Sequence, residues 1–198
     1  YVDDALLDSQ LCTTYSKSLK TLTPITTYTS SKENLDKVLS NSPQTIRIFL
    51  GDKVNHIHEK SGLNWGFGRG NVNISDAYIA LRKGLIEEIP DFFPFNGVNP
   101  NIGTGQSKKN SRQNADAVFD DGTSMKLSFE GIGSKGYFKQ ISSFPQKKIL
   151  GLYIRERLGI SANTKISHDI LKNYGRDNID VTKTGDGLYS FDFGVPKK

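Results

Sequence analysis

Cysteine, histidine and long apolar runs are all scarce in this sequence of 198 residues. The single cysteine, Cys12, has no internal disulfide partner, and one cysteine with three histidines is too little for a structural zinc site. No window approaches the roughly 18 consecutive apolar residues of a membrane-spanning helix. These absences exclude a disulfide scaffold and a spanning helix, and we expect a cytoplasmic protein with no membrane partner.

The N-terminal segment differs in composition from the rest of the chain. The sequence begins at Tyr1 and shows no signal-peptide pattern, so we expect a fragment of a longer protein. Residues 1–44 are rich in serine and threonine, which is typical of a linker. Within them, the capping-box spacing of Ser30 and Glu33 predicts a short helix over 31–39. The compact domain is predicted to begin at residue 45.

Positive charge is concentrated outside this segment. The chain has 26 Lys and Arg against 21 Asp and Glu, a net charge of +5. Residues 1–52 hold five of the cations and six of the acids, so the remainder carries +6. Segments 106–114 and 131–148 contain cations and no acid. They favour a polyanionic partner, although lysines on solvated loops would give the same composition.

Six short segments show the features of β-strands. Ile46, Ile48 and Leu50 alternate with other residues, with the period of a half-buried strand. The Asp121-Gly122 pair between two apolar runs is typical of a hairpin turn. The glycine-rich composition of 61–73 argues against a helix, and 131–144 is interpreted as a loop. The predicted strands are 45–50, 77–81, 115–119, 125–129, 179–183 and 189–193.

Two further helices are predicted near the C-terminus. The first covers 146–158 and ends at Gly159, with residues 155–157 as its solvent face. Ser167 is expected to cap a second helix that Gly175 ends. The fold is therefore mainly β with two or three short helices, as a barrel or a sandwich. The expected buried stripe of the first helix is Ile149, Leu150, Leu152, Tyr153 and Leu158.

The sequence shows no convincing catalytic set. His56 and His58, beside Glu59, have the spacing of two metal ligands on a strand, but a third ligand is missing. His58 is followed two residues later by Lys60, but the aspartate that a phospholipase-D nuclease also requires is missing, since positions 64 and 65 are asparagine and tryptophan. The glycines of 66–70 do not lead into a nucleotide-binding helix. We therefore assign no catalytic residue, metal or cofactor.

Two loops carry the residue types that read nucleic acid. Residues 64–71 and 134–140 combine glycine and aromatic residues with Arg, Lys, Asn or Gln, whose side chains pair with base edges. Trp65 and Phe67 also fit a role as packing anchors for the first loop. The candidate base-reading residues are Asn64, Trp65, Arg69, Asn71, Lys135, Tyr137, Lys139 and Gln140. The candidate phosphate contacts are Lys60, Lys108, Lys109, Arg112, Lys147 and Lys148.

One run of residues resembles a known family. Residues 59–66 (EKSGLNWG) and 76–79 (DAYI) are similar to the C-terminal half of the NgoFVII-type restriction endonucleases. Further similarities follow in the same order at 92–94, 120–122, 150–159 and 174–176. Phe67 departs from the family pattern, which has glutamine there. The resemblance covers about residues 45–193.

The resemblance implies a DNA-recognition domain of a bacterial, phospholipase-D-family type II restriction endonuclease. Its fold would be similar to plant B-three domains: a seven-stranded open pseudobarrel with two or three short helices, whose two arms clasp the major groove of double-stranded DNA. Residues 61–73 and 131–140 would be the arms. Residues 1–44 would be a linker and the remnant of the catalytic domain, and 45–198 the DNA-binding domain. The intact protein would be a homodimer through its nuclease domain, with an ATPase subunit in some relatives.

Two other functions remain open from the residues alone. A metal-dependent nuclease would use His56 and His58 with acids such as Asp120. A single-stranded nucleic-acid binder would stack bases on Trp65, Phe67 and Tyr137.

Overall fold

The first strand of the sheet has one buried face and one exposed face. Our computed structural model describes residues 44–89, 91–93, 112–132 and 138–195, so the predicted helix over 31–39 lies outside the described residues. In β1 (Thr45–Phe49), Ile46 and Ile48 are buried and the residues between them are exposed. This alternation is expected of a strand with one solvated face, and it confirms the predicted strand.

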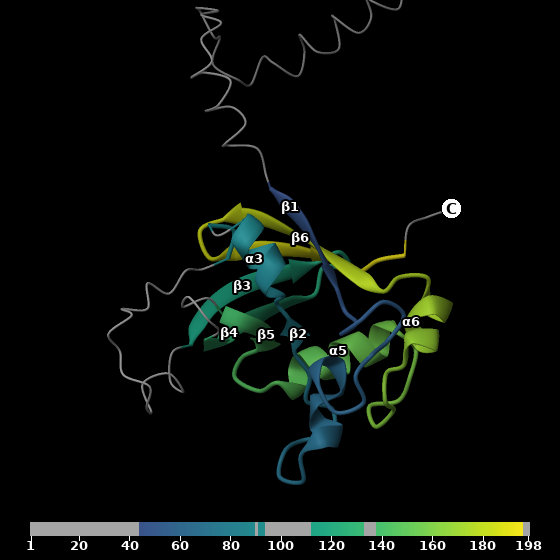
Figure 1. The fold of residues 1–198 in the computed structure, drawn as a ribbon. Coiled ribbons are helices and arrows are strands. Elements are labelled where there is room, and N and C mark those ends of the chain that lie inside the picture. Colours follow the sequence, from purple (N-terminus) through teal and green to yellow (C-terminus); the bar gives the residue numbers. More distant parts are fainter. Residues whose placement is uncertain (1–43, 90, 94–111, 133–137, 196–198) are drawn as a thin grey trace, which may run out of the picture. The chain divides into compact units, whose positions relative to one another are not determined.

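The described residues form one seven-stranded sheet that curls into an open barrel (Figure 1). The strand order is β1-β6-β7-β3-β4-β5-β2, in which β3 and β7 are parallel and the other five described pairs are antiparallel. The expected mainly β, seven-stranded open pseudobarrel is confirmed. After β1, the strands are β2 (Ile79–Ala80), β3 (Gln113–Phe119), β4 (Ser124–Ile132), β5 (Phe138–Ser143), β6 (Asn178–Gly185) and β7 (Leu188–Asp192).

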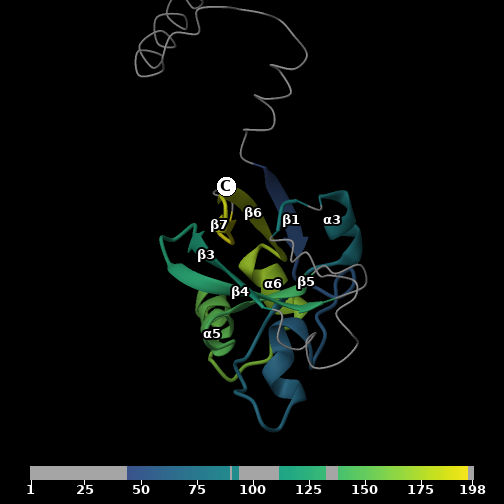
Figure 2. The ribbon, with the colours of Figure 1, turned by 90° about the vertical axis from the view of Figure 1, so that its left-hand side faces the viewer.

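Within the described residues, four short helices accompany the sheet: η2 (Gly62–Gly68), α3 (Lys83–Glu88), α5 (Lys148–Arg157) and α6 (His168–Tyr174). Figures 1 and 2 show η2 and α5 in the lower half of the molecule, away from the start of β1. The caps of α6 confirm the prediction: Ser167 Oγ accepts a hydrogen bond from the Ile170 amide, and Gly175 ends the helix with φ of 94°. None of the described helices is long and apolar enough to cross a membrane.

A cluster of aromatic side chains lies within the otherwise mainly aliphatic core. Phe129 on β4 lies 5.4 Å from Phe93 and 5.9 Å from Tyr189 on β7, measured between ring centroids. Phe92 packs edge-on against Phe93 at 4.8 Å. These rings are almost fully buried, so the segment after α3 closes the inside of the pseudobarrel and contributes to its hydrophobic stabilisation.

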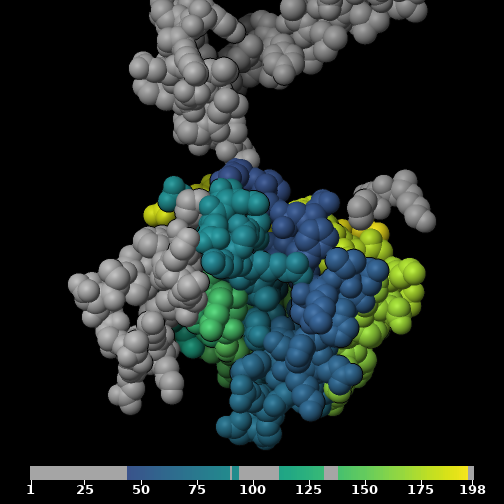
Figure 3. Space-filling view, in the orientation of Figure 1, coloured from purple at the N-terminus to yellow at the C-terminus, as the bar shows by residue number. Residues whose placement is uncertain are grey.

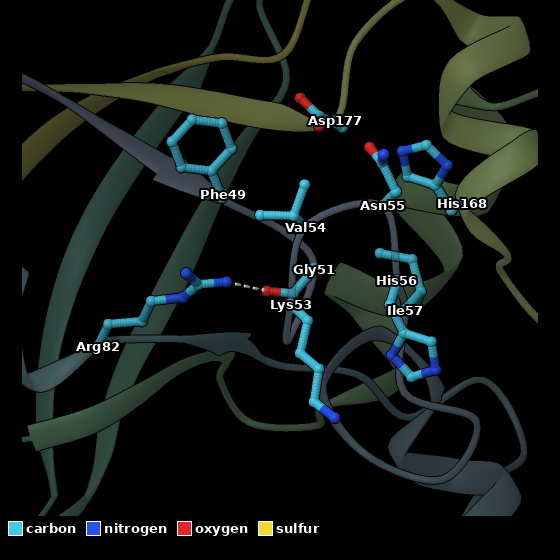
Figure 4. A pocket seen from close by; sticks show the side chains of 10 residues that line it. All are labelled: Phe49, Gly51, Lys53, Val54, Asn55, His56, Ile57, Arg82, His168 and Asp177. Atoms are coloured by element: carbon cyan, nitrogen blue, oxygen red, sulfur yellow. Dashed lines mark hydrogen bonds between the residues drawn. The ribbon is translucent and has the colours of Figure 1, made fainter.

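A side-chain hydrogen bond links the ends of the two edge strands. Arg82, which follows β2, donates from Nη2 to the carbonyl of Gly51, which follows β1, at 2.6 Å (Figure 4). The bond borders a cavity of about 190 Å³ whose lining includes Phe49, His56 and His168. The edge strands β1 and β2 do not pair with each other, and the Arg82 side chain connects their ends.

Two loop predictions were wrong. The segment 131–144 contains β5, whose backbone pairs with β4 through positions such as Phe129↔Ile141. This ladder overrides the local glycine, serine and lysine composition, because strand formation depends on pairing and burial more than on intrinsic propensity. The segment 61–73, for which a helix was excluded, begins with the 3₁₀ helix η2. Short 3₁₀ turns tolerate glycine and need no long periodic pattern.

The predicted faces of α5 were also partly wrong. Arg155 was expected to face solvent, but only 1% of it is exposed. Ile149 and Leu152, expected in the buried stripe, are 37% and 39% exposed. Arg157 lies against the β3–β4 turn and donates from Nη2 to Asp120 Oδ2 at 2.7 Å. The helix is therefore rotated relative to the sequence prediction, and it buries a charged residue.

Candidate nucleic-acid interface

The buried Arg155 of α5 holds the root of the segment 61–73. Its guanidinium and Nε donate to four backbone carbonyls, those of Leu63 at 3.2 Å, Ser75 at 3.4 Å, Gly151 at 3.1 Å and Thr164 at 2.9 Å. Burial lowers the pKa of Arg155, although a guanidinium stays charged in proteins. The Arg155 side chain thus connects the start of the segment, at Leu63, and the residue after its end, Ser75, to α5 and to the loop that follows α5.

Asn64 has a second structural role at the same root. Its Nδ2 donates to the carbonyls of His58 at 3.2 Å and Ile166 at 2.7 Å, and its Oδ1 accepts from the Ile166 amide at 2.9 Å. Only 1% of the residue is exposed. A side chain with its amide occupied in this way is not available to a base edge, so the predicted base contacts of this segment fall to its exposed residues.

Two glycines allow the close packing of this root. A Cβ on Gly66 would lie 2.2 Å from the carbonyl oxygen of Asn73, and a Cβ on Gly151 would lie 1.7 Å from that of Ser75. Neither distance leaves room for a side chain. Gly66 therefore allows η2 to pack against the backbone of Asn73, and Gly151 allows α5 to pack against the backbone of Ser75. The Gly66 amide donates to the Asp76 carbonyl at 2.9 Å and closes the base.

Aromatic side chains connect the root to the exposed part of the segment. Trp65 packs edge-on against Tyr78 with ring centroids 5.7 Å apart, and the guanidinium carbon of Arg69 lies 4.7 Å above the Trp65 ring. The ring centroid of Phe67 lies 5.8 Å from the guanidinium carbon of Arg155 and 5.7 Å from Lys165 Nζ. Both aromatics act as anchors in the free domain, and Trp65 also supports an exposed arginine through a cation–π contact.

The remainder of the segment is exposed and carries donors and acceptors. Residues 68–74, which include Arg69 and Asn71, are exposed, as is Lys60 just before the segment. Figure 3 shows this part of the chain as the lower end of the visible face. The segment therefore has a rigid, buried root and a polar tip.

The second predicted loop connects β4 to β5, and residues 133–137 of it lie outside the described residues. Gly131, the second-last residue of β4, has φ of 65°, a conformation that favours glycine. Phe138, at the start of β5, is 3% exposed and anchors the returning strand. Lys139 is exposed and Gln140 is half-buried. Lys135 and Tyr137 lie outside the described residues, as do Lys108 and Lys109 of the long polar loop.

Glu130, which was not among the residues predicted from the sequence, contacts three of the candidate DNA-binding residues. Glu130 of β4 lies 3.0 Å from Arg112 Nη2 and 2.5 Å from Lys147 Nζ, and it accepts from Gln140 Nε2 at 3.2 Å. Burial raises the pKa of Glu130, but Lys147 and Arg112 outweigh it and the net pKa is lowered. Lys148, the first residue of α5, is half-buried and does not share in these contacts. Glu130 is the only acid between Asp121 and Glu156, which is the sequence signal that marks it.

The two segments are connected through the sheet. β2 follows the first segment and pairs with β5, which returns from the second, through Ile79↔Ile141 and Ala80↔Gln140. Gln140 is also the register partner of Glu130 across β4. The roots of both predicted arms therefore belong to neighbouring strands of one sheet.

The histidine pair does not form a metal site in the part of the chain that the structure describes. His56 Nδ1 lies 2.6 Å from Asp52 Oδ1, and His58 Nδ1 accepts from the Lys60 amide at 3.1 Å. Among the described residues, no three His, Cys, Asp or Glu side chains are grouped so that they could hold a metal ion. The nuclease alternative gains no support from this pair.

The OB-fold, another open barrel, binds ligands partly through loops between its strands, and here the segment between β1 and β2 carries exposed polar side chains. Residues 38–185 match the family model of the NgoFVII C-terminal B3-like DNA-binding domain. The chain belongs to this restriction endonuclease family and is a DNA-binding domain. No curated protein is a significant match.

Proposed function

We propose that the domain reads a short site in double-stranded DNA through two arms that enter the major groove. The N-terminal arm is residues 61–73, and the C-terminal arm is residues 131–140. The domain would serve as the target-recognition part of a type II restriction endonuclease whose nuclease domain is separate. Membership of a DNA-binding family supports the partner, and the anchored root with a polar tip supports the arm.

The observation that carries the proposal is the setting of Arg69. Its exposed guanidinium rests on Trp65, and Trp65 stands on a root fixed by Arg155 and Asn64. An arginine held in place before binding loses less conformational entropy when it forms a bidentate pair with guanine O6 and N7. Asn71, Lys139 and Gln140, with Lys135 and Tyr137, are the other proposed base contacts. Lys60, Lys108, Lys109, Arg112, Lys147 and Lys148 are the proposed phosphate contacts.

The wider assembly is part of the same proposal. We infer that residues 45–198 are the DNA-binding domain and that residues 1–44 link it to the nuclease domain. The intact enzyme would be a homodimer through that nuclease domain in the bacterial cytoplasm, with an ATPase subunit as a further candidate partner. Size measurement of the full-length protein, alone and with a co-expressed ATPase, tests this assembly.

Selection from a randomised double-stranded DNA library tests the main proposal. The 198-residue chain is incubated with the library in chelator at moderate salt, and the retained DNA is sequenced over several rounds. We expect one short motif to be enriched. Retention without a motif contradicts site recognition. Cleavage by the isolated chain that chelator abolishes supports the nuclease alternative, and a preference for unpaired oligonucleotides supports the single-strand alternative.

Substitution of Arg69 is expected to affect one base pair of the site. Arg69→Ala removes the proposed fork, so affinity for the selected motif falls by about 1–3 kcal/mol and discrimination is relaxed at one position. Lys60→Ala, at the root of the same arm, is the matched control for loss of one positive charge. Lys60→Ala is expected to lower the affinity for DNA of every sequence by the same factor and to reduce the salt dependence of binding. Equal loss on every sequence for Arg69→Ala removes Arg69 from the base contacts.

A further inference from the structure

The Glu130 cluster consists of Glu130, Arg112, Lys147 and Gln140. It contains a carboxylate, which a phosphate-binding surface does not require. Glu130 is surrounded by Arg112, Lys147 and Gln140, all of which are proposed DNA contacts. A carboxylate in such a place repels the phosphate backbone and competes for the same cations. We propose that Glu130 is a specificity-determining residue that restrains these side chains and suppresses binding to unrelated DNA. This inference rests on the proposed function.

The geometry shows that the restraint is strong. The side chains of Glu130 and Lys147 are 13% and 25% exposed, so their contact at 2.5 Å is partly shielded from solvent, whereas Arg112, 3.0 Å from Glu130, is 47% exposed. Ion pairs in such surroundings are less screened by salt than exposed pairs. By comparison, the Asp116–Lys126 pair on the neighbouring part of the sheet spans 4.0 Å between side chains that are 67% and 52% exposed. Of these two acids on the β3–β4 pair, Glu130 holds its cations more closely than Asp116 does.

The location explains why the restraint acts on recognition. Arg112 directly precedes β3, Gln140 lies on β5, and Lys147 directly precedes α5. Glu130 therefore ties three separate elements together at the base of the hairpin that carries the C-terminal arm. The contacts with Glu130 orient Arg112 and Lys147 and offset part of their positive charge. A duplex whose acceptors match this orientation gains their remaining donors, whereas an unrelated duplex offers only the general attraction of its phosphates.

The test compares Glu130→Gln with Asp116→Asn, since both remove one negative charge from the same strand pair. Binding is measured for the selected motif and for a scrambled duplex across a series of salt concentrations. For Glu130→Gln we expect about a fivefold to tenfold gain on the scrambled duplex at 0.1 M salt, and a salt dependence steeper by about one phosphate contact. Gain on the motif is expected to be smaller, so discrimination falls. Asp116→Asn is expected to change both affinities equally.

Two further variants separate a recognition role from a structural one. In an Arg112→Gln/Lys147→Gln background, the Glu130→Gln change is expected to leave scrambled-duplex binding unaltered, because no restrained cation remains. Glu130→Asp keeps the charge but is shorter, so it cannot contact Arg112 and Lys147 together as Glu130 does. Its discrimination is expected to lie between those of the wild-type domain and Glu130→Gln.

Several results overturn the inference. Wild-type discrimination in Glu130→Gln, or an effect no larger than that of Asp116→Asn, removes the special role of Glu130. Failure of both Glu130→Gln and Glu130→Asp to fold makes Glu130 a structural residue. If the wild-type domain itself selects no motif, the proposed function fails first. If it selects a motif and the variants discriminate equally well, only the role of Glu130 fails.

Discussion

Replacing Arg155 with methionine is expected to lower the free energy of unfolding by about 3–5 kcal/mol. The guanidinium is 1% exposed and donates to four carbonyls. Methionine fills part of its volume but donates to none of them, so buried carbonyls lose their charged partner. Urea unfolding followed by the fluorescence of the single tryptophan, Trp65, measures the change at the arm itself.

Because Trp65 reports only on the arm, unfolding of the whole domain is measured by a second method. Circular dichroism of the same samples reports the sheet, so an earlier fluorescence transition shows that the arm detaches first. Arg155→Lys keeps the charge but lacks the planar fork, and it is also expected to be destabilised. The exposed Arg69→Met is the matched control, for which we expect the free energy of unfolding to stay within about 0.5 kcal/mol. A loss below about 1 kcal/mol for Arg155→Met contradicts the assigned role.

Introducing alanine at Gly151 is expected to lower the free energy of unfolding by about 3 kcal/mol. Its Cβ would lie 1.7 Å from the Ser75 carbonyl oxygen and 3.1 Å from the Ala77 Cβ. The arm must therefore move away from α5, which also lengthens the Arg155 contacts. Affinity for the selected DNA motif is expected to fall together with stability, because Arg69 loses its support. Thermal unfolding and motif binding of one preparation measure both effects.

Gly84 supplies the control for this change. It lies in the helix α3, and a Cβ there would meet nothing within 4 Å. Alanine stabilises helices by up to about 1 kcal/mol relative to glycine, so Gly84→Ala is expected to be neutral or mildly stabilising. If Gly151→Ala behaves like Gly84→Ala, the arm is not packed on α5 as the structure describes.

The features that the sequence predicted well are those with local causes. The turn at 120–122 and the caps Ser167 and Gly175 depend on residues within a few positions of one another. The alternation in β1 likewise follows from one buried face, and family resemblance supplied the number of strands. These features appear in the structure where they were predicted.

The features that the sequence did not predict depend on distant contacts. β5 exists because it pairs with β4 and β2, and nothing in its own composition indicates this. Arg155 looks like a surface residue until the carbonyls of Leu63 and Ser75 are placed around it. Asn64 was predicted to read DNA because asparagine on a glycine-rich loop suits that role, but burial depends on Ile166, which is remote in the sequence.

The strand order has a consequence for the synthesis of the protein. β1 pairs with β6, and the hydroxyls of Thr45 and Thr182 lie 2.8 Å apart although 137 positions separate them. A ribosome therefore releases the first strand long before its partner exists, with the apolar side chains of Ile46 and Ile48 still uncovered. Folds dominated by such distant pairings form in milliseconds to seconds rather than microseconds. The nascent domain thus passes through a period in which chaperones have an exposed strand to bind.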